Sequence, residues 1–282
     1  MQWYDRQLDR LSMPVMARQV STSFGTTHML MAGPEDTRAL IVLHGMNMNA
    51  AAMIGAIREL SVVRRVVAID IIGMPGKSAG MRPARKGDGY PRWLGEVMDI
   101  VGITRADLLG ESFGGWLSLK SAALWPERVK SVVLLDSGGI VPFTVRGQVV
   151  AGLAALRHIL ERSARSRLKA AKPFYGPDIS VDPHFAELLG LTLQHTRMDI
   201  DLRGLPVLGR AQLKSFQAPV FVSYGEYDVF FNVHRATRRA KQIFAGPVLT
   251  EVVERQGHRH SEAATQARYE RVRNFLDSVA TG

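Results

Sequence analysis

The stretch that decides the fold is residues 106–124, which read ADLLGESFGGWLSLKSAAL. An apolar run leads into Gly110-Glu111-Ser112-Phe113-Gly114, and a helix-favouring run follows that ends before Pro126. This is the order strand, sharp turn, helix. A serine on such a turn holds its hydroxyl out of the sheet, and the flanking glycines leave room for the nearby helix. Ser112 is therefore the candidate nucleophile.

The same Gly-x-Ser-x-Gly pattern occurs around Ser78, at residues 76–80, but the chain context differs. Pro83 follows, together with two further glycines, so no helix can start there. The overlapping segment also looks like part of a phosphate-binding loop, yet Ile71 stands where such a loop needs glycine. We expect neither a second nucleophile nor a nucleotide site in this segment.

On both sides of residues 106–124, short apolar runs alternate with helical segments, as in a mainly parallel sheet with helices on both faces. Expected strands are residues 20–24, 28–31, 39–43, 65–71, 106–109, 129–135, 219–224 and 248–253. Expected helices are residues 50–60, 93–101, 112–124, 232–244 and 261–279. The alternation breaks at residues 140–213, which are mostly helical. We therefore predict an α/β core of residues 1–139 and 214–282 with a helical insert, residues 140–213.

Composition narrows the classes of chemistry. The 282 residues include no cysteine, which excludes disulfides, thiolate metal sites and cysteine nucleophiles. The net charge is +10, but no nucleic-acid-binding module or interleaved aromatic pattern accompanies it, so we expect no nucleic-acid partner. Residues 1–14 carry interspersed charges, and no apolar run reaches the roughly 20 residues of a membrane span. We expect a cytoplasmic protein with no membrane span.

A serine hydroxyl needs a base, and the base needs an orienting carboxylate. Both should follow strands that end at the same edge of the sheet as Ser112. Asp228 follows the apolar run at residues 219–224, and His258 follows the last expected strand. The chain order Ser112, Asp228, His258 is the order found in hydrolases with a strand-elbow serine.

With these residues in place, the sequence resembles the α/β-hydrolase fold superfamily, in its serine esterase and lipase-like branch. The segment Leu43-His44-Gly45-Met46 is similar to the family's oxyanion loop, and residues 70–78 are similar to its Asp-x-x-Gly-x-Gly-x-Ser loop, one residue longer. Gly257-His258 followed by a terminal helix also fits. The resemblance implies a mostly parallel eight-stranded sheet, with residues 140–213 as its lid.

The resemblance also implies roles. Ser112 attacks an acyl carbonyl, His258 moves the proton and Asp228 fixes the imidazole tautomer, while the backbone N–H groups of Met46 and Phe113 stabilise the oxyanion. Water then releases the acyl group, with no metal or organic cofactor. Since the nucleophile is a serine, carboxylate-dependent relatives such as dehalogenases and epoxide hydrolases are disfavoured.

Alternatives remain for each role. His260 competes with His258 as the base, and Asp136, at the end of the strand after residues 112–124, competes with Asp228 as the acid. Glu226 is expected to be a loop residue. His44 is expected to be structural, although a zinc site of His44, His258 and His260 is conceivable.

Residues 153–172 predict one amphipathic helix of the lid. Its apolar residues are Leu153, Leu156, Leu160, Ala164, Leu168 and Ala171, and its remaining face carries Arg157, Arg162, Arg165, Arg167, Lys169 and Lys172 against Glu161 alone. This basic face is either a solvated outer surface or a docking face for an acidic carrier protein or an anionic substrate group.

The sequence thus predicts a serine hydrolase that cleaves a small or medium carboxylic ester through an acyl-enzyme. A thioesterase or an acyl-transferring or cyclising biosynthetic enzyme is one alternative, because the same site can pass its acyl group to another nucleophile. A non-catalytic ligand-binding protein on the same fold is another. The substrate is expected to be a small ester or thioester, and the protein a monomer or homodimer.

Overall fold

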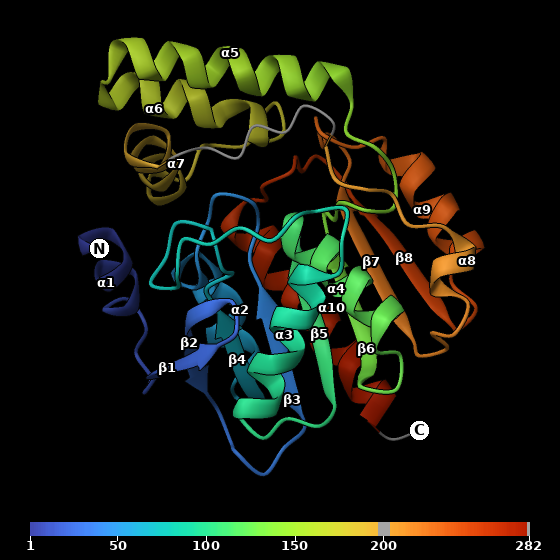
Figure 1. The fold of residues 1–282 in the computed structure, drawn as a ribbon. Coiled ribbons are helices and arrows are strands. Elements are labelled where there is room, and N and C mark those ends of the chain that lie inside the picture. The colour runs from blue at the N-terminus through green and yellow to red at the C-terminus, as the bar shows by residue number, and fades with distance from the viewer. Residues whose placement is uncertain (197–203, 281–282) are drawn as a thin grey trace.

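The computed structural model describes residues 1–196 and 204–280, and within them eight strands form one sheet in the order β1-β2-β4-β3-β5-β6-β7-β8 (Figure 1). The strands are β1 Met16–Thr22, β2 Gly25–Ala32, β3 Ala39–Leu43, β4 Arg65–Ile69, β5 Ala106–Glu111, β6 Val129–Leu135, β7 Val220–Gly225 and β8 Val248–Val253. β2 pairs antiparallel with β1 and β4, and the other neighbours are parallel. The predicted mostly parallel, eight-stranded sheet is confirmed.

Helices cover both faces of this sheet (Figure 1). They are α1 Gln2–Leu8, α2 Ile54–Leu60, α3 Gly89–Ile100, α4 Phe113–Leu124, α5 Val145–Glu161, α6 Ala164–Ala171, α7 Pro183–His195, α8 Arg210–Leu213, α9 Val233–Ile243 and α10 Glu262–Ala280, with 3-10 turns η1 Ala50–Met53 and η2 Lys172–Phe174. Asn49 caps the start of η1, and its side chain accepts a hydrogen bond from the Ala52 amide. The predicted helix at residues 50–60 therefore begins as a 3-10 turn.

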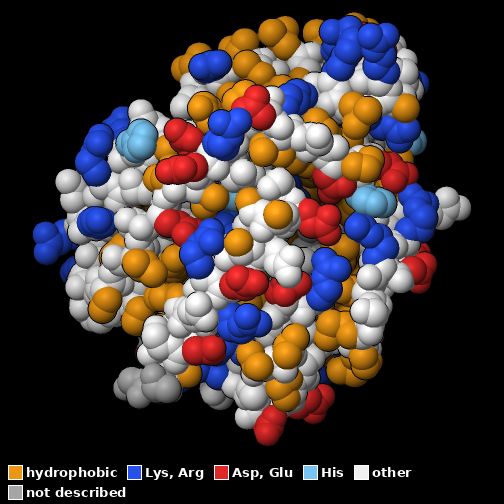
Figure 2. Space-filling view, turned by 180° about the vertical axis from the view of Figure 1, so that it is seen from behind, with side chains coloured by type: hydrophobic (Ala, Val, Ile, Leu, Met, Phe, Trp, Pro, Cys, Tyr) orange, Lys and Arg blue, Asp and Glu red, His pale blue; other side chains and the backbone are white. Residues whose placement is uncertain are grey.

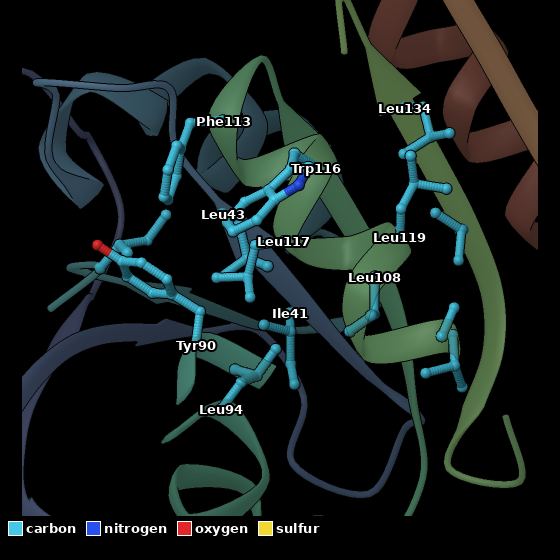
Figure 3. Packing of buried hydrophobic residues seen from close by; sticks show 14 of the residues in the cluster. Ile41, Leu43, Tyr90, Leu94, Leu108, Phe113, Trp116, Leu117, Leu119 and Leu134 are labelled. Atoms are coloured by element: carbon cyan, nitrogen blue, oxygen red, sulfur yellow. The ribbon is translucent and has the colours of Figure 1, made fainter. Parts of the chain in front are cut away.

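Alternating strand residues divide the core into two layers, because successive side chains of a strand point to opposite faces. On β3, Ile41 and Leu43 pack with α3, α4 and α9, whereas Leu40 and Val42 pack with α1, α2 and α10. Figure 3 shows Leu94 of α3 and Trp116 of α4 beside the first of these faces. Every residue of β3, β5 and β7 is buried, which explains why β3 is apolar throughout and why the other two strands are mostly apolar.

Helices α5, α6 and α7 lie over the carboxyl ends of the strands (Figure 1). α5, α6 and α7 all lie between β6 and β7 in the chain, within the predicted insert. Phe185 and Ala186 of α7 share a small buried cluster with Ala171 of α6 and with Tyr175. Residues 197–203 of the predicted insert lie outside the described residues.

The single helix predicted at residues 153–172 is wrong. α5 ends at Glu161, Arg162 takes a left-handed conformation with φ of 49°, and Ser163 caps α6 through a reciprocal hydrogen-bonded box with Ser166. A local cap therefore overrides the apolar periodicity. The leucines of that periodicity are also exposed, with Leu153 63% and Leu160 75% accessible.

One helix, α1, was not predicted. Its Trp3 and Tyr4 are buried in the layer with α2 and α10, and the Tyr4 hydroxyl donates to Asp70 at 3.1 Å. No helix of residues 1–196 or 204–280 has the length and hydropathy needed to cross a bilayer.

Candidate active site

The turn between β5 and α4 places Ser112 at the amino end of α4, with φ of 53°. A positive φ is strained for a serine and persists only where the surroundings enforce it. The two motif glycines provide that enforcement. A Cβ on Gly110 would lie 2.3 Å from the Gly114 carbonyl carbon, and one on Gly114 would lie 2.1 Å from the Leu43 oxygen. The motif is thus required by the close approach of strand, turn and helix.

The loop after β3 runs beside Ser112 and carries one of the predicted oxyanion donors. A Cβ on Gly45 would lie 3.6 Å from the Ser112 Cβ. Among the described residues, the amides of Met46 and Phe113 donate to no protein acceptor. The Phe113 amide is also the first of helix α4, where the helix dipole favours negative charge. Both amides are available to an incoming oxyanion.

His44 supports this loop from beneath, as the sequence analysis expected. Its Nδ1 pairs with the Gly45 oxygen at 2.8 Å, and its Nε2 accepts from the Ile71 amide at 2.9 Å. Burial lowers the pKa of His44, so the ring is neutral and Nδ1 carries the proton that it donates. Both ring nitrogens are therefore occupied, which leaves none for a zinc ion.

The loops after β7 and β8 bring Asp228 and His258 together. His258 Nδ1 lies 2.8 Å from Asp228 Oδ2, and the other carboxylate oxygen accepts from the amides of Phe230 and Phe231 at 2.7 and 3.3 Å. Burial lowers the pKa of His258, but the Asp228 carboxylate outweighs it and the net shift is upward. Burial raises the pKa of Asp228 against the attraction of the imidazole. The Asp228 carboxylate therefore holds the imidazole in place and stabilises the positive charge that His258 gains when it takes up a proton.

Ser112 reaches the same edge of the sheet as this pair. The Ser112 amide donates to the Leu135 carbonyl oxygen at 2.9 Å, and the Gly138 amide donates to the Ser112 carbonyl oxygen at 3.0 Å. These backbone hydrogen bonds hold the turn against the end of β6. Among the described residues no hydrogen bond joins Ser112 Oγ to the imidazole. Such bonds are often long before substrate binds and tighten in the complex.

The competing candidates lie behind the pair. Asp136, with φ of 46°, accepts from Arg268 Nη1 at 2.5 Å and from the Gly225 amide at 2.8 Å. His260 Nε2 lies 3.5 Å from Asp136 and 3.1 Å from Arg268 Nη1. Burial and the neighbouring guanidinium lower the pKa of His260. Asp136 therefore orients the backbone before Asp228 and pairs with Arg268, and the imidazole of His258 bonds to Asp228 instead.

The remaining motif residues have structural partners. The Ser78 hydroxyl donates to the Asp70 carbonyl oxygen at 2.6 Å and accepts from the His28 amide of β2 at 2.9 Å. Ser78 therefore links its own loop to these two segments. Asp70 accepts from the Ala50 and Lys77 amides at 2.7 and 3.0 Å. Glu226 is exposed and accepts from the Arg255 amide at 2.8 Å, as expected of a loop residue.

One group of side chains could hold a metal by proximity. Donor atoms of Asp136, Asp228 and His258 lie within 4.8 Å of one another. Arg268 already places a guanidinium on Asp136, and His258 Nδ1 is bonded to Asp228. A cation would have to displace both contacts, so this donor set suits a proton-moving pair better than a metal, and we assign no metal to it.

Three aromatic rings lie close to the His258 imidazole. Ring centroids of Phe230, Phe231 and Phe174 lie 4.8, 5.9 and 6.2 Å from the imidazole centroid. Phe143 stacks on Phe231 at 5.0 Å. Phe174 belongs to η2, and Phe143 lies between β6 and α5, so the segment after β6 supplies part of this wall. The site is apolar beside the base.

Sequence reasoning missed three charged residues around the site: Glu111, Arg259 and Arg268. Glu111 and Arg259 form an ion pair at 2.6 Å, and Arg268 pairs with Asp136 as described above. The only available signal was position, since Glu111 precedes Ser112 and Arg259 follows His258 in the chain.

This architecture, with a serine elbow after β5 and an acid and a histidine after β7 and β8, defines a class of protein. A family model described as alpha/beta hydrolase fold matches residues 38–155. The crystal structure of carboxylesterase CesB (YbfK) from Bacillus subtilis superposes with a TM-score of 0.83 at 26% identity, covering 99% of this chain and 96% of that one. The chain has the α/β-hydrolase fold, and the resemblance drawn from its motifs is confirmed.

Its similarity extends to esterases over the full length. Carboxylesterase YbfK of Bacillus subtilis (strain 168) is 29% identical over 281 residues, 98% of this chain and 92% of that protein. The crystal structure of naproxen esterase (carboxylesterase NP) from Bacillus subtilis has a TM-score of 0.83 at 27% identity, covering 98% of this chain and 96% of that one.

Proposed function

We propose that the protein is a serine carboxylesterase that cleaves a small or medium ester through an acyl-enzyme. The observation that carries the proposal is the 2.8 Å contact of His258 with Asp228 at the sheet edge where Ser112 begins α4. Full-length similarity to carboxylesterases supports the same conclusion. A raised pKa and a fixed tautomer suit His258 to act as a base near neutral pH.

The proposed reaction has two matching halves. Ser112 Oγ attacks the ester carbonyl while His258 Nε2 takes its proton, and the amides of Met46 and Phe113 bind the oxyanion. When the tetrahedral intermediate collapses, its bond to the leaving-group oxygen breaks. His258 donates its proton to that oxygen, so the leaving group departs as an alcohol. Water then attacks the acyl-enzyme in the same way and releases the acid. An oxyanion donor typically contributes about 3 kcal/mol to lowering the barrier.

The rings beside His258 support an ester with an apolar or aromatic group. A ring or alkyl chain placed against Phe230 and Phe143 would bury apolar surface without leaving a polar group unpaired. We propose in addition that residues 140–213 act as the lid of this pocket, because Phe143 and Phe174 come from that segment.

Labelling with a fluorophosphonate probe, mapped by mass spectrometry, tests the proposed function. We expect the probe on Ser112 in the wild-type protein and no labelling in Ser112→Ala or His258→Ala. Hydrolysis of p-nitrophenyl esters of increasing acyl length then measures the substrate range. A folded wild-type protein that neither labels nor hydrolyses any ester would contradict the proposal and favour a ligand-binding role.

The predicted acidic carrier protein is a finer proposal, which the basic residues at the α5–α6 junction support. Arg162, Arg165 and Lys169 are exposed there. Reversing all three to Glu should raise KM for a carrier-bound ester about tenfold or more, since each lost contact and each new repulsion weakens docking. KM for a small ester should not change, and equal effects on both substrates would refute carrier docking. The cytoplasmic location and the oligomeric state stay predictions.

A further inference from the structure

A buried carboxylate and a partly buried guanidinium flank the nucleophile and the base in the chain and meet in space. Glu111 precedes Ser112, Arg259 follows His258, and Arg259 Nη1 lies 2.6 Å from Glu111 Oε1. Their side chains are only 8% and 24% exposed. Removing two ions from water carries a desolvation penalty that offsets their attraction, so such a pair is weak evidence that it stabilises the fold. The pair therefore calls for a functional role.

The same arginine connects the base to the helices above the site. The Arg259 amide donates to the Phe174 oxygen of η2 at 2.7 Å, and its guanidinium lies 4.9 Å from the Phe185 ring centroid of α7. The packing is tight at this point, because a Cβ on Gly257 would lie 2.5 Å from the Phe174 oxygen. The loop that carries His258 is therefore held between the lid segment on one side and Glu111 on the other.

Other charged groups around the pair are already engaged. Asp136 is held by Arg268, and Asp228 by His258. Tyr175, Tyr269 and Asp182 are the remaining titratable groups that act on Arg259, and His260 and Arg268 lie within the field of Glu111. A cavity of about 740 Å³ between the core and α7 is lined by both members of the pair. Glu111 thus has one direct cationic partner among the described residues, and that partner is Arg259.

We propose that the Glu111–Arg259 ion pair positions the catalytic groups: it fixes the His258 loop against the Ser112 turn and ties both to the lid through Phe174 and Phe185. The proposal rests on the proposed function, since it assigns the pair a role in that reaction. Neither side chain touches the reacting atoms, so both are positioning residues. A misplacement of about 1 Å between nucleophile and base can lower a rate about a hundredfold.

The experiment compares four proteins with p-nitrophenyl butyrate: wild type, Glu111→Gln, Arg259→Met and the double variant Glu111→Gln/Arg259→Met. Each is assayed for Tm, kcat, KM and the pH profile of kcat/KM. Single variants should lose stability, because each leaves one buried polar or charged group without its partner, and the double variant should recover part of that loss. We expect kcat to stay about tenfold to a hundredfold below wild type in all three, with KM changed less than threefold.

The pH profile separates position from packing. Burial lowers the pKa of His258, and the carboxylates of Asp228, Asp136 and Glu111 together raise it above its usual value. Removing the Glu111 charge should lower the pKa of His258, so the base stays deprotonated to lower pH and the acid limb of kcat/KM moves to lower pH in Glu111→Gln. A Glu111 charge too remote to act on the imidazole would leave this limb unchanged.

The opposite end of β5 offers a matched control. Asp107 is also buried on this strand and pairs with Arg64 at 3.4 Å, remote from Ser112. Asp107→Asn should lower Tm yet leave kcat and the acid limb as in wild type.

If the wild-type protein is an active esterase, two results with the variants would overturn the proposal. One is a double variant that regains kcat together with Tm, which would make the pair structural only. The other is a folded Glu111→Gln protein with unchanged kcat and acid limb. A wild-type protein that hydrolyses no ester and does not label at Ser112 would instead contradict the proposed function itself, and this proposal with it.

Discussion

Asp228 and Asp136 lie side by side at the carboxyl ends of the sheet, and their neighbours assign them different tasks. Asp228 faces His258, whereas Asp136 faces Arg268 and the Gly225 amide. Burial would raise the pKa of Asp136, but the guanidinium reverses this and holds it far below its usual range. One carboxylate is thus left to orient the imidazole, and the other is neutralised by a cation.

This division predicts how the two carboxylates respond to amidation. Asp228→Asn should lower kcat about a thousandfold to ten-thousandfold, because the amide favours the wrong imidazole tautomer. The acid limb of kcat/KM should also move to lower pH, since the charge that raises the pKa of His258 is lost. Rates measured from pH 5 to pH 9 at about half-unit steps would show both effects. If Asp136→Asn, folded, had the larger loss of kcat, the assignment of the acid would be wrong.

The two Gly-x-Ser-x-Gly motifs provide a second residue-scale prediction. A Cβ on Gly114 would overlap the Leu43 backbone, while one on Gly80, at the same position of the other motif, meets nothing within 4 Å. Gly114→Ala should therefore destabilise the fold by about 1–3 kcal/mol, as overpacking does, and Gly80→Ala should change it by less than about 0.5 kcal/mol. Urea unfolding of both variants makes the comparison, and equal losses would contradict it.

At the scale of elements, α5 presents an apolar side to solvent. Val149, Leu153, Leu156 and Leu160 are more than half exposed, with Val145 at the start of the helix. Figure 2 shows hydrophobic side chains along the top of the molecule, where α5 lies, and a group of Lys and Arg side chains at one end of them. The segment α5–α7 is instead anchored to the core through α7, whose Phe185 and Leu188 are buried.

The anchoring of α7 predicts which residues of α5–α7 stabilise the fold. Phe185→Ala should lower the free energy of unfolding by about 3–5 kcal/mol, because it opens a cavity between Phe174 and Tyr175. Leu153→Gln with Leu160→Gln should change it by less than about 1 kcal/mol, since both side chains are exposed. Chemical denaturation measures both. A large loss in the double glutamine variant would mean that another part of the protein, or a second copy, covers α5.

At the scale of the whole molecule, buried histidines couple stability to pH. Burial lowers the pKa of His44 and of His260, so both are neutral in the fold and take up a proton on unfolding once the pH is below about 6.5. The pKa of His258 is raised, so its stabilising contribution is complete below about pH 6.5 and is lost only as pH rises. Below that pH the neutral buried histidines change the balance, and His158, whose pKa burial and the Arg167 charge also lower, adds to their effect.

We therefore expect the free energy of unfolding to fall between pH 6.5 and 5 by roughly 1–3 kcal/mol per pH unit, the slope for one or two protons bound on unfolding. Urea titrations at about four pH values across this window would measure it. His260→Asn should reduce the slope by about one proton. A stability that is flat or rises on acidification would show that neither histidine is neutral in the fold.

Much of this molecule followed from its sequence. The alternation of apolar runs and helical segments determined the parallel sheet, because strands buried on both faces are mostly apolar. The residues around Ser112 determined the turn, because only glycine fits where α4 meets β3. Local caps were harder to read, and Ser163 divides a helix that apolar periodicity predicts as continuous. α1 was missed because it is short and its buried residues pack against η1, a segment distant in the sequence.

Tertiary structure alone decided the contacts between segments far apart in the chain. Two acids and two histidines satisfied the sequence criteria, and only the packing of β6, β7 and α10 paired His258 with Asp228 and gave Asp136 to Arg268. The same holds for Glu111 and Arg259, which are 148 residues apart. Spacing along the chain fixes which face a residue takes within one element, but which charges become neighbours depends on how separate elements pack.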